Sequence, residues 1–374
     1  MIKEYTALGL MSGTSGDGVD ASVIVSDGDN TYRVIKDKYF KYNQAIFEDI
    51  HDLKDKLTTI KDIEKNIVNI KELEKKITLF HAQVVKELSQ NYKFELVGFH
   101  GQTIYHNAKE KISKQLGNGP LLSQLTKKKV VYNFRENDLK NGGQGAPLTP
   151  IFHKVLLKQK KNKLPAAILN IGGIANITII ENFSKNNFKS YDVGPGNCLI
   201  DEWIRKNSDK NFDKNGKHSS SGTHNEIILE QIQDNFNDYF EKKKNFSLDT
   251  KDFDISFVRG LSINDGAATL AEFTSRIIGS ALSLLIKKDD KKLFNVLLSG
   301  GGRKNKDLIR RISEKIPQNF KFQLIDEIGV NGDFVESQAF AYLAIRTLIK
   351  LPISFPSSTG CSQDTIGGEI VEFK

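Results

Sequence analysis

LGLMSGTSGDGVDASVIV at residues 8–25 and ILNIGGIANITII at residues 168–180 follow the same pattern. In each stretch a short apolar run leads into a glycine-rich turn and then into a second apolar run. Runs of this length that are rich in β-branched residues and broken by glycine predict two strands joined by a turn. Because the pattern returns roughly half a chain later, we expect a duplicated α/β architecture with two lobes.

Strands and helices alternate through the rest of the chain. Isoleucines and leucines at spacings of three and four over residues 60–77 predict one amphipathic helix. We expect one domain over residues 1–133 and a second over residues 134–374, with a tail from residue 351 that packs back on the body. Strands are expected at 19–26, 32–42, 95–99, 130–134, 166–171 and 296–298, and helices from near 149, at 265–285 and at 336–348.

The composition is that of a globular protein with an ordinary core. Of 374 residues, 39% are hydrophobic, and no apolar run approaches the roughly 18 residues of a membrane span. The first residues, MIKEYTALGLMSGTSGDG, lack the long apolar stretch of a signal peptide. Two cysteines, Cys198 and Cys361, cannot build a disulfide framework. We therefore expect a cytoplasmic protein with no membrane partner.

The formal net charge of +8 comes mainly from lysines, some of them in runs such as residues 127–129. A nucleic-acid-binding protein typically interleaves basic residues with exposed aromatics or carries a known module. The sequence has neither pattern, so we interpret the lysines as solvated surface. We expect no nucleic-acid partner.

The turn of the first copy, Ser12–Gly18, has the composition of an anion-binding loop. Its glycines let backbone N–H groups approach a phosphate closely, and Thr14 and Ser15 add hydroxyl donors. Asp17 is suited to hold a magnesium ion through water. The turn joins two strands and lacks the Lys-Ser/Thr ending of a P-loop, so it predicts a phosphate-binding hairpin like that of actin-like ATPases. An ordinary tight hairpin is the alternative.

Two further glycine clusters follow strands. Gly300, Gly301 and Gly302 lie between an apolar strand and a helix, where bare backbone suits an anion or a nucleotide base. Gly172 and Gly173 form the turn of the second copy. A plain strand-to-helix turn seldom needs three glycines, and ligands of α/β sheets gather at strand ends. Together the three turns predict an ATP cleft between the two lobes.

Asp192 is the leading candidate for a catalytic base. It stands where a predicted strand ends and the turn at residues 194–196 begins, so we expect its carboxylate to face the cleft. The alternative is an Asx-turn aspartate that bonds only its own backbone.

His100 and Glu336 have stronger structural alternatives. A single histidine after a strand is more often structural than catalytic, and residues 333–336 fit a capping box at the start of a helix. The histidines show no metal-ligand spacing, so we expect no structural zinc.

Eight motifs, in order, give the chain a family resemblance. Within residues 8–344 they are GLMSGTSGDGVDAS, GFHGQTIYH, NGGQGAPLTP, LNIGGIANIT, DVGPGN, DGAATLAEFT, LSGGGRKN and ESQAFAYLA, and LPISFPSSTG extends the match to residue 360. Over nearly its whole length the chain thus resembles the anhydro-N-acetylmuramic acid kinases. The resemblance implies the duplicated, two-lobed actin-like ATPase (ribonuclease H-like) fold of that family, with a central cleft.

The resemblance also implies an activity. Members of the family hydrolyse the 1,6-anhydro bridge of anhydro-N-acetylmuramic acid, an amino sugar recycled from the bacterial cell wall. They transfer the γ-phosphate of ATP to the freed 6-oxygen, which gives N-acetylmuramic acid 6-phosphate and ADP. By resemblance we expect ATP and Mg²⁺ as cofactors, a small amino sugar as substrate and a homodimer as the assembly.

The family's site residues carry over by position. Asp192 would activate water against the anomeric carbon, and Asp17 would hold the metal. The sugar pocket or its support would include Arg135, Asp138, Gln144 and Glu336. The nucleotide would contact Gly13, Thr14, Ser15, Gly16, Asp17, Gly18, Val19, Asp20, Gly172, Gly173, Gly300, Gly301 and Gly302.

One departure from the family pattern falls in the phosphate loop, where Gly16 replaces the usual leucine. Two other functions remain open. The chain could be an actin-fold phosphotransferase for a different sugar or acid, which product analysis would separate. It could also be a non-enzymatic ATPase module, in which Asp192 is structural and sugar does not accelerate ATP turnover.

Overall fold

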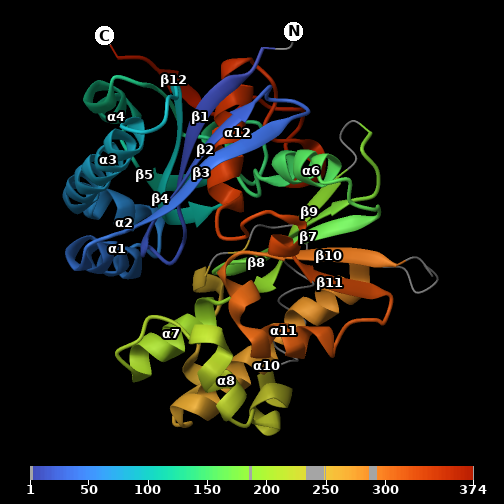
Figure 1. Cartoon of the computed structure of the whole chain (residues 1–374). Coiled ribbons are helices and arrows are strands. Elements are labelled where there is room, and N and C mark those ends of the chain that lie inside the picture. The colour runs from blue at the N-terminus through green and yellow to red at the C-terminus, as the bar shows by residue number, and fades with distance from the viewer. Residues whose placement is uncertain (1–2, 185–187, 233–247, 249, 286–292, 374) are drawn as a thin grey trace. The chain divides into compact units, whose positions relative to one another are not determined.

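The structure, a computed structural model, describes residues 3–184, 188–232, 248, 250–285 and 293–373 (Figure 1). The chain forms two compact units. Unit 1 comprises Met1–Asn162, Phe183–Phe188 and Asp333–Lys374, and unit 2 comprises Lys163–Asn182 and Lys189–Gly332. None of the described helices has the length and apolar character needed to cross a bilayer.

Unit 1 contains a sheet with strand order β12-β6-β4-β1-β2-β3, in which β5 pairs with β4. Its strands are β1 (Tyr5–Ser12), β2 (Gly18–Ser26), β3 (Tyr32–Lys41), β4 (Leu96–Asn107), β5 (Ile112–Leu116), β6 (Lys129–Tyr132) and β12 (Glu369–Val371). Its helices are α1 (Gln44–Lys56), α2 (Ile60–Lys65), α3 (Ile67–Ser89), α4 (Gly119–Thr126), α5 (Glu136–Lys140), α6 (Pro150–Gln159), α12 (Val335–Leu348) and α13 (Pro356–Thr359).

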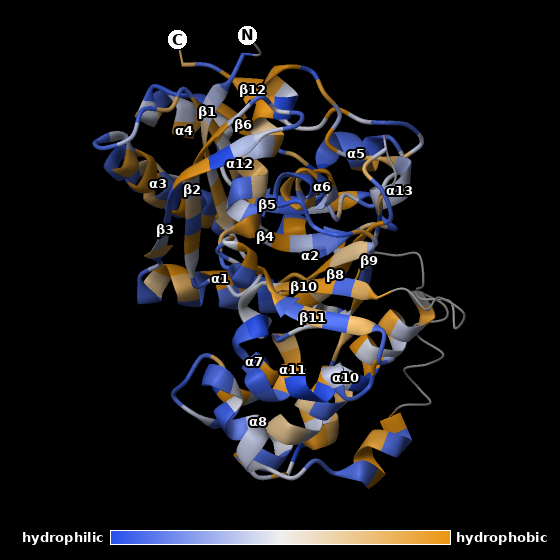
Figure 2. Cartoon of the chain, turned by 45° about the vertical axis from the view of Figure 1, so that its right-hand side comes forward, coloured by the Kyte–Doolittle hydropathy of each residue, from blue (hydrophilic) through white to orange (hydrophobic). Residues whose placement is uncertain are grey.

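One face of this sheet carries an apolar core. Leu8 and Leu10 of β1 are fully buried there, together with Ile50 of α1 and Ile77 of α3. Figure 2 shows apolar and hydrophilic stretches alternating along α3, as expected for a helix that packs one face on a sheet. Helix α1 is thereby fixed next to the strand that leads into the glycine-rich turn.

The opposite face of the sheet lies against α12. Gly9 of β1 and Gly98 of β4 stand side by side in parallel register. A β-carbon on Gly9 would lie 1.9 Å from the Ser337 carbonyl oxygen, and one on Gly98 would lie 2.3 Å from that of Phe340. Because both positions lack a side chain, α12 packs directly on the backbone of the two strands.

Unit 2 contains a sheet with strand order β11-β10-β7-β8-β9. Its strands are β7 (Ala166–Ile171), β8 (Ile174–Ile180), β9 (Phe188–Pro195), β10 (Phe294–Ser299) and β11 (Phe320–Leu324). Its helices are α7 (Cys198–Asn207), α8 (Lys217–Ser221), α10 (Ile263–Leu285) and α11 (Lys306–Ser313), with short 3-10 turns η1 (Lys214–Gly216), η2 (Thr250–Asp252), η3 (Ser256–Val258), η4 (Gly301–Lys304) and η5 (Ile325–Ile328).

The two sheets repeat one plan, which confirms the predicted duplication. In unit 1, β1 pairs antiparallel with β2 and parallel with β4. In unit 2, β7 pairs antiparallel with β8 and parallel with β10. Each unit therefore starts with a hairpin closed by a glycine-rich turn and then adds a strand parallel to the first. This is the α/β architecture expected from the repeated sequence pattern.

The expected domain boundary between residues 133 and 134 does not follow these units. Residues 134–162 and 333–374 belong to unit 1. The physical reason is that α12 packs on β1 and that β12 of the tail pairs antiparallel with β6, Ile370 opposite Val131. The C-terminal tail thus completes the first sheet.

Two local expectations were also wrong. The helix predicted over residues 60–77 is two helices, because α2 ends before Asn66 and α3 begins at Ile67. Ile60 and Ile67 are 40% and 43% exposed, so the buried stripe starts only at Ile70. The strand expected to end at residue 99 continues as β4 to Asn107.

Candidate active site

The glycine-rich turn of unit 1 reverses the chain between β1 and β2. The Gly16 N–H donates to the Gly13 carbonyl oxygen at 3.1 Å. Gly16 has a φ of +64°, a conformation that disfavours residues with a β-carbon. Residues 18–20, which we expected in the phosphate loop, are the first residues of β2. The predicted phosphate-binding residues therefore divide between a tight turn and the start of a strand.

Helix α1 holds the turn through backbone carbonyl oxygens. The Lys54 Nζ donates to the Thr14 carbonyl oxygen at 2.6 Å. The His51 Nε2 lies 2.9 Å from the Ser15 carbonyl oxygen, to which it can only donate. The turn is thus anchored to α1 through the carbonyl oxygens of Thr14 and Ser15.

Gln102 of the neighbouring strand β4 supports the turn, a role that was not predicted from the sequence. Its side chain is fully buried in β4, with Nε2 donating to the Gly13 carbonyl oxygen at 2.9 Å and Oε1 lying 2.6 Å from the Ser12 hydroxyl. The Ser12 hydroxyl also lies 2.9 Å from the Gly18 carbonyl oxygen. No clear signal in the sequence indicated this role, because the strand was expected to end at residue 99, before Gln102. A buried amide needs partners, and the structure supplies them.

A second cluster in unit 1 contains three of the predicted sugar-pocket residues. Arg135 donates from Nη1 to the Gly145 carbonyl oxygen at 2.7 Å, and its Nη2 lies 2.8 Å from the His100 Nε2. The Gln144 N–H donates to the Thr359 carbonyl oxygen at 2.9 Å. These bonds hold the loop that carries the NGGQG motif.

Asp138 lies beneath the same loop with no exposed surface. Its Oδ2 accepts from the Gly145 N–H at 2.7 Å, and its Oδ1 accepts from the Thr359 hydroxyl at 2.6 Å. A β-carbon on Gly143 would lie 2.2 Å from the Asp138 carboxylate. Asp138 therefore shapes the loop.

Glu336 is partly buried near the start of α12. The N-cap residue of α12 is Phe334, which forms no side-chain cap bond. Burial raises the pKa of Glu336 above its ordinary value, and the positive charge of Arg135 opposes that rise. The structure thus places Glu336 within the electrostatic reach of Arg135.

In unit 2 the glycine turn after β7, at residues 172–173, forms backbone hydrogen bonds with the turn at the end of β9. The Asn197 N–H donates to the Gly172 carbonyl oxygen at 2.7 Å, and the Gly196 N–H donates to that of Gly173 at 2.9 Å. A β-carbon on Gly196 would lie 2.1 Å from the Gly172 carbonyl oxygen. Gly196 is therefore needed for the two turns to touch along their backbones.

The third glycine cluster meets the same strand end. Gly300 has a φ of +77°, and a β-carbon there would lie 2.6 Å from the Ile171 carbonyl oxygen. A β-carbon on Gly302 would lie 2.2 Å from the Ile171 side chain, whereas one on Gly301 would meet only Asn197 Nδ2 at 3.8 Å. The glycine turns of unit 2 at residues 172–173, 194–196 and 300–302 thus converge at one end of its sheet.

Arg303 fixes this third cluster, and its role was not predicted. It is 6% exposed and donates from Nη1 to the Gly300 carbonyl oxygen at 2.9 Å. Its Nε and Nη2 donate to the two carboxylate oxygens of Asp326 at 2.7 and 2.9 Å. This bidentate pair holds the pKa of Asp326 below its ordinary value.

Asp192 lies within β9, three residues before the strand ends. Its carboxylate is partly buried, and Oδ2 accepts from the Leu248 N–H at 2.8 Å. This partner is distant in sequence, so the carboxylate makes a bond that a simple Asx-turn does not require. The arrangement orients a carboxylate beside the converging turns of unit 2.

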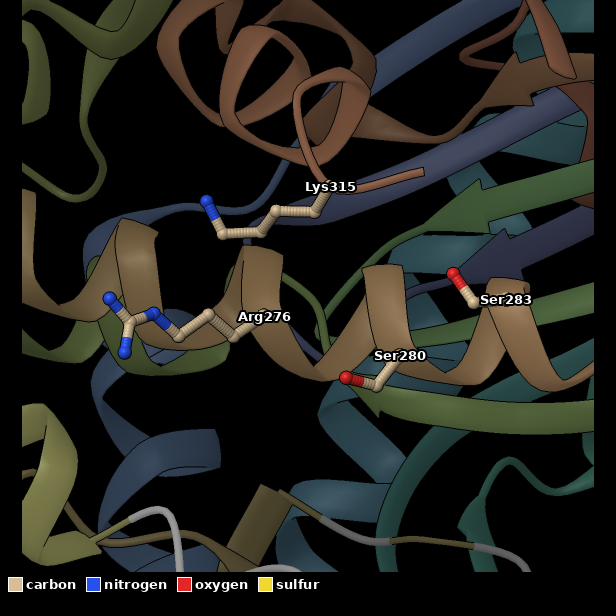
Figure 3. A pocket seen from close by; sticks show the side chains of 4 residues that line it. All are labelled: Arg276, Ser280, Ser283 and Lys315. Atoms are coloured by element: carbon tan, nitrogen blue, oxygen red, sulfur yellow. The ribbon is translucent and has the colours of Figure 1, made fainter. Parts of the chain in front are cut away.

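A pocket of about 360 Å³ opens elsewhere in unit 2, between α10 and the residues after α11 (Figure 3). Arg276, Ser280, Ser283 and Lys315 line it. Its two cations are already paired, since Arg276 Nε lies 3.0 Å and Lys315 Nζ lies 2.9 Å from Glu272 Oε1. None of the predicted site residues lines this pocket.

Among the described residues, no group of three or more His, Cys, Asp or Glu side chains gathers as a metal site. Any divalent ion held by Asp17 would therefore depend on oxygens from water or from a ligand.

The chain resembles known proteins over its whole length. The family model for anhydro-N-acetylmuramic acid kinase matches residues 5–372. A protein of that name from Pelagibacter ubique is 53% identical over 374 residues and covers 100% of both chains. Another from Zymomonas mobilis is 35% identical over 372 residues, with 97% of this chain and 99% of the relative covered.

Likeness to solved structures is weaker. The activator of the 2-hydroxyisocaproyl-CoA dehydratase from Clostridium difficile, with bound ADPNP, shares 10% identity at a TM-score of 0.42, with 92% of this chain and 96% of that chain covered. A TM-score this low supports no conclusion about the present chain.

Proposed function

The chain belongs to the anhydro-N-acetylmuramic acid kinase family, and we propose that it opens the 1,6-anhydro bridge of that sugar while phosphorylating the 6-oxygen with ATP. The products are N-acetylmuramic acid 6-phosphate and ADP. The observation that carries the proposal is the 53% identity to a kinase of this name across both full lengths.

Unit 1 supplies the phosphate loop in this proposal. Residues 13–17 form a turn whose carbonyl oxygens are tied to α1 by Lys54 and His51. Acceptor groups bound in this way leave the loop's N–H groups, other than that of Gly16, as the natural contacts for an anion. Gly18, Val19 and Asp20 extend the loop into β2 and complete the segment assigned to ATP.

The surroundings of Asp17 fit a hydrated magnesium ion. Asp17 is exposed, and its carboxylate Oδ1 accepts from the Ser15 hydroxyl at 2.5 Å. Mg²⁺ keeps several waters in protein sites and takes one or two carboxylates plus substrate phosphates. When bound, the ion would neutralise charge on the transferring phosphate. Asp17 would hold it through water, with Ser15 fixing the carboxylate.

Unit 2 supplies the adenosine segment and the base. Gly172, Gly173 and Gly300–Gly302 form this segment. Among the last three, Gly301 has the most open missing β-carbon, with Asn197 Nδ2 at 3.8 Å, which suits contact with a flat nucleoside. Asp192 takes a proton from water as the water oxygen bonds to the anomeric carbon. The bond from that carbon to the 6-oxygen breaks, and negative charge develops on the 6-oxygen. This charge is stabilised as the 6-oxygen attacks the γ-phosphorus in line. The bond to the ADP oxygen then breaks.

The loop of unit 1 that carries Gln144 is assigned to the sugar. Arg135 and Gln144 would contact the substrate, and Asp138 would support them because its oxygens are already bonded. Glu336 has a raised pKa, which suits a carboxyl group that exchanges hydrogen bonds with sugar hydroxyls.

Two further assignments rest on the family alone. We propose a homodimer and a cytoplasmic location. The location agrees with the unpaired state of Cys198 and Cys361. Light scattering coupled to size-exclusion chromatography tests the dimer, and a monomer at all concentrations would reject it.

A substrate panel tests the proposed activity. The purified enzyme is given ATP and Mg²⁺ with anhydro-N-acetylmuramic acid, N-acetylmuramic acid, N-acetylmannosamine or glucose. ADP release should be accelerated by the anhydro sugar far more than by the others. Equal or greater acceleration by another sugar would favour a different phosphotransferase, and no acceleration by any sugar would favour a non-enzymatic ATPase.

A further inference from the structure

His100 lies in β4 with 4% of its surface exposed and contacts two groups of opposite kind. Its Nδ1 lies 2.8 Å from the Gly101 carbonyl oxygen, which can only accept, so Nδ1 carries the hydrogen. Its Nε2 lies 2.8 Å from Arg135 Nη2, which can only donate, so Nε2 offers its lone pair. Both contacts are satisfied by one form of the ring, the neutral Nδ1–H tautomer.

The surroundings keep His100 in that form and orientation. Burial lowers the pKa of His100 well below its ordinary value, and the positive charge of Arg135 lowers it further. The ring of Phe340 packs against the imidazole with centroids 4.5 Å apart. The ring is therefore held in plane and uncharged, and its Nε2 remains an acceptor.

The guanidinium of Arg135 is held at both of its terminal nitrogens. Nη2 is bound by His100, and Nη1 donates to the Gly145 carbonyl oxygen at 2.7 Å. Gly145 is in turn held by Asp138 through its N–H. The Gly145 carbonyl oxygen and the His100 Nε2 are neutral acceptors, and together they fix the orientation of the guanidinium.

We propose that His100 is a positioning residue that aims Arg135 at the sugar by accepting its hydrogen bond at Nε2. The inference rests on the proposed place of Arg135 in the sugar pocket. The substrate is a muramic acid and therefore bears a carboxylate, the group that a fixed guanidinium recognises best. His100 itself makes no contact with substrate in this account.

Two substitutions separate positioning from a merely structural role. Asparagine in His100→Asn can keep the hydrogen bond to Gly101 but is too short to reach Arg135. Glutamine in His100→Gln places its Oε1 near the former Nε2 and can still accept from Arg135. A structural role through Gly101 predicts greater damage in His100→Gln, whereas positioning predicts greater damage in His100→Asn.

KM for anhydro-N-acetylmuramic acid, KM for ATP and kcat are measured for both variants. We expect His100→Asn to raise the sugar KM about ten-fold or more, a loss typical of one charge-assisted hydrogen bond, with the ATP KM unchanged. His100→Gln should stay within about three-fold of wild type. Equal effects of both variants, or the reverse order, would overturn the positioning role.

Arg135→Lys separates this inference from the proposed function. If Arg135→Lys leaves the sugar KM unchanged, the assignment of Arg135 to the sugar pocket fails. If Arg135→Lys raises the sugar KM while His100→Asn does not, only the positioning by His100 fails.

A measurement on the wild-type protein covers the case in which the variants do not fold. Nitrogen-15 NMR of histidine side chains at pH 7 reports the tautomer directly. A neutral ring protonated at Nδ1 is the expected result. A ring protonated at Nε2, or at both nitrogens, would contradict the hydrogen bond from Arg135 and the inference with it.

Discussion

The carboxylate Oδ2 of Asp192 accepts a hydrogen bond from the backbone N–H of Leu248 at 2.8 Å. This bond orients the carboxylate from outside its own strand. A base that must take a proton from water in one direction benefits from such a fixed orientation.

Asp192→Asn should therefore lower kcat strongly while the protein stays folded. The amide oxygen can still accept from Leu248, but the amide cannot take a proton. General-base catalysis contributes about 10²–10⁴-fold, and we expect a loss of that size in steady-state ADP release. Asp209→Asn, at an exposed aspartate of the same unit, is the matched control. A near-normal kcat in Asp192→Asn would show that Asp192 is not the catalytic base.

Gly16→Ala should destabilise the protein and weaken ATP binding. The glycine has a φ of +64°, and an added β-carbon would lie 2.9 Å from Ile50 Cγ2. Gly260→Ala is a suitable control because Gly260 also has a positive φ, +90°, but no atom within 4 Å of its missing β-carbon. Both variants should lose about 1 kcal/mol from the backbone term, and Gly16→Ala should lose more in urea denaturation. Equal losses would mean that α1 does not confine the turn.

Arg303→Lys should raise the KM for ATP by roughly ten-fold and leave the sugar KM unchanged. A lysine cannot reproduce the bidentate pair with Asp326 and the bond to Gly300 at once. Arg310→Lys, at a half-exposed arginine on α11, should have little effect on either constant. An unchanged ATP KM in Arg303→Lys would argue that Gly300–Gly302 does not contact the nucleotide.

Stability should fall in acid through Glu272. Burial alone would raise the pKa of Glu272, but hydrogen bonds from Lys315, Arg276 and Arg311 outweigh burial and lower the pKa to about 2. A carboxyl group with a depressed folded-state pKa stabilises the fold above its unfolded pKa, near 4.5, and loses that contribution as the pH falls toward 2.

Glu272→Gln tests this relationship. The substitution should cost about 3 kcal/mol in urea denaturation at pH 7, because it breaks a buried ion pair and leaves charged partners behind. The difference from wild type should shrink as the pH is lowered through 4.5. Glu202→Gln, which removes an exposed pair with Lys206, should cost less than about 1 kcal/mol. A Glu272→Gln penalty that is constant with pH would show that the carboxylate's charge does not stabilise the fold.

Local patterns in the sequence predicted the hairpins of both sheets closely. The strand expected at residues 166–171 is β7 with the same bounds, and the strand expected at 19–26 is β2 with one added residue. These strands are buried and apolar with glycines at their turns, so the local pattern and the final burial agree.

Features that depend on distant residues escaped prediction. Gln102 bonds Gly13 across 89 positions, and β12 pairs with β6 more than two hundred residues upstream. The break at Asn66 interrupts a helix whose spacing of apolar residues continues through it. Periodicity shows which residues share a face, but it does not show where the backbone bends or which segment returns to a sheet.

The predicted site residues gather into separate groups within the two units. The turn at residues 13–17 and the loop at residues 142–145 belong to unit 1, and the three converging glycine turns belong to unit 2. The roles of the polar residues that hold these groups, chiefly Gln102 and Arg303, were not predicted from the sequence. Their roles appear only when the bonds to backbone carbonyl oxygens are seen.

Oxygen-18 water tests the central claim most directly. The enzyme is incubated with ATP, Mg²⁺ and anhydro-N-acetylmuramic acid in labelled water, and the early products are weighed by mass spectrometry. A parallel sample of N-acetylmuramic acid 6-phosphate corrects for slow exchange of the anomeric hydroxyl. The account predicts a 6-phosphorylated sugar that carries one oxygen-18 from the first turnovers. A phosphosugar without the label, or no phosphosugar from folded protein that binds ATP, would contradict bridge opening coupled to phosphoryl transfer.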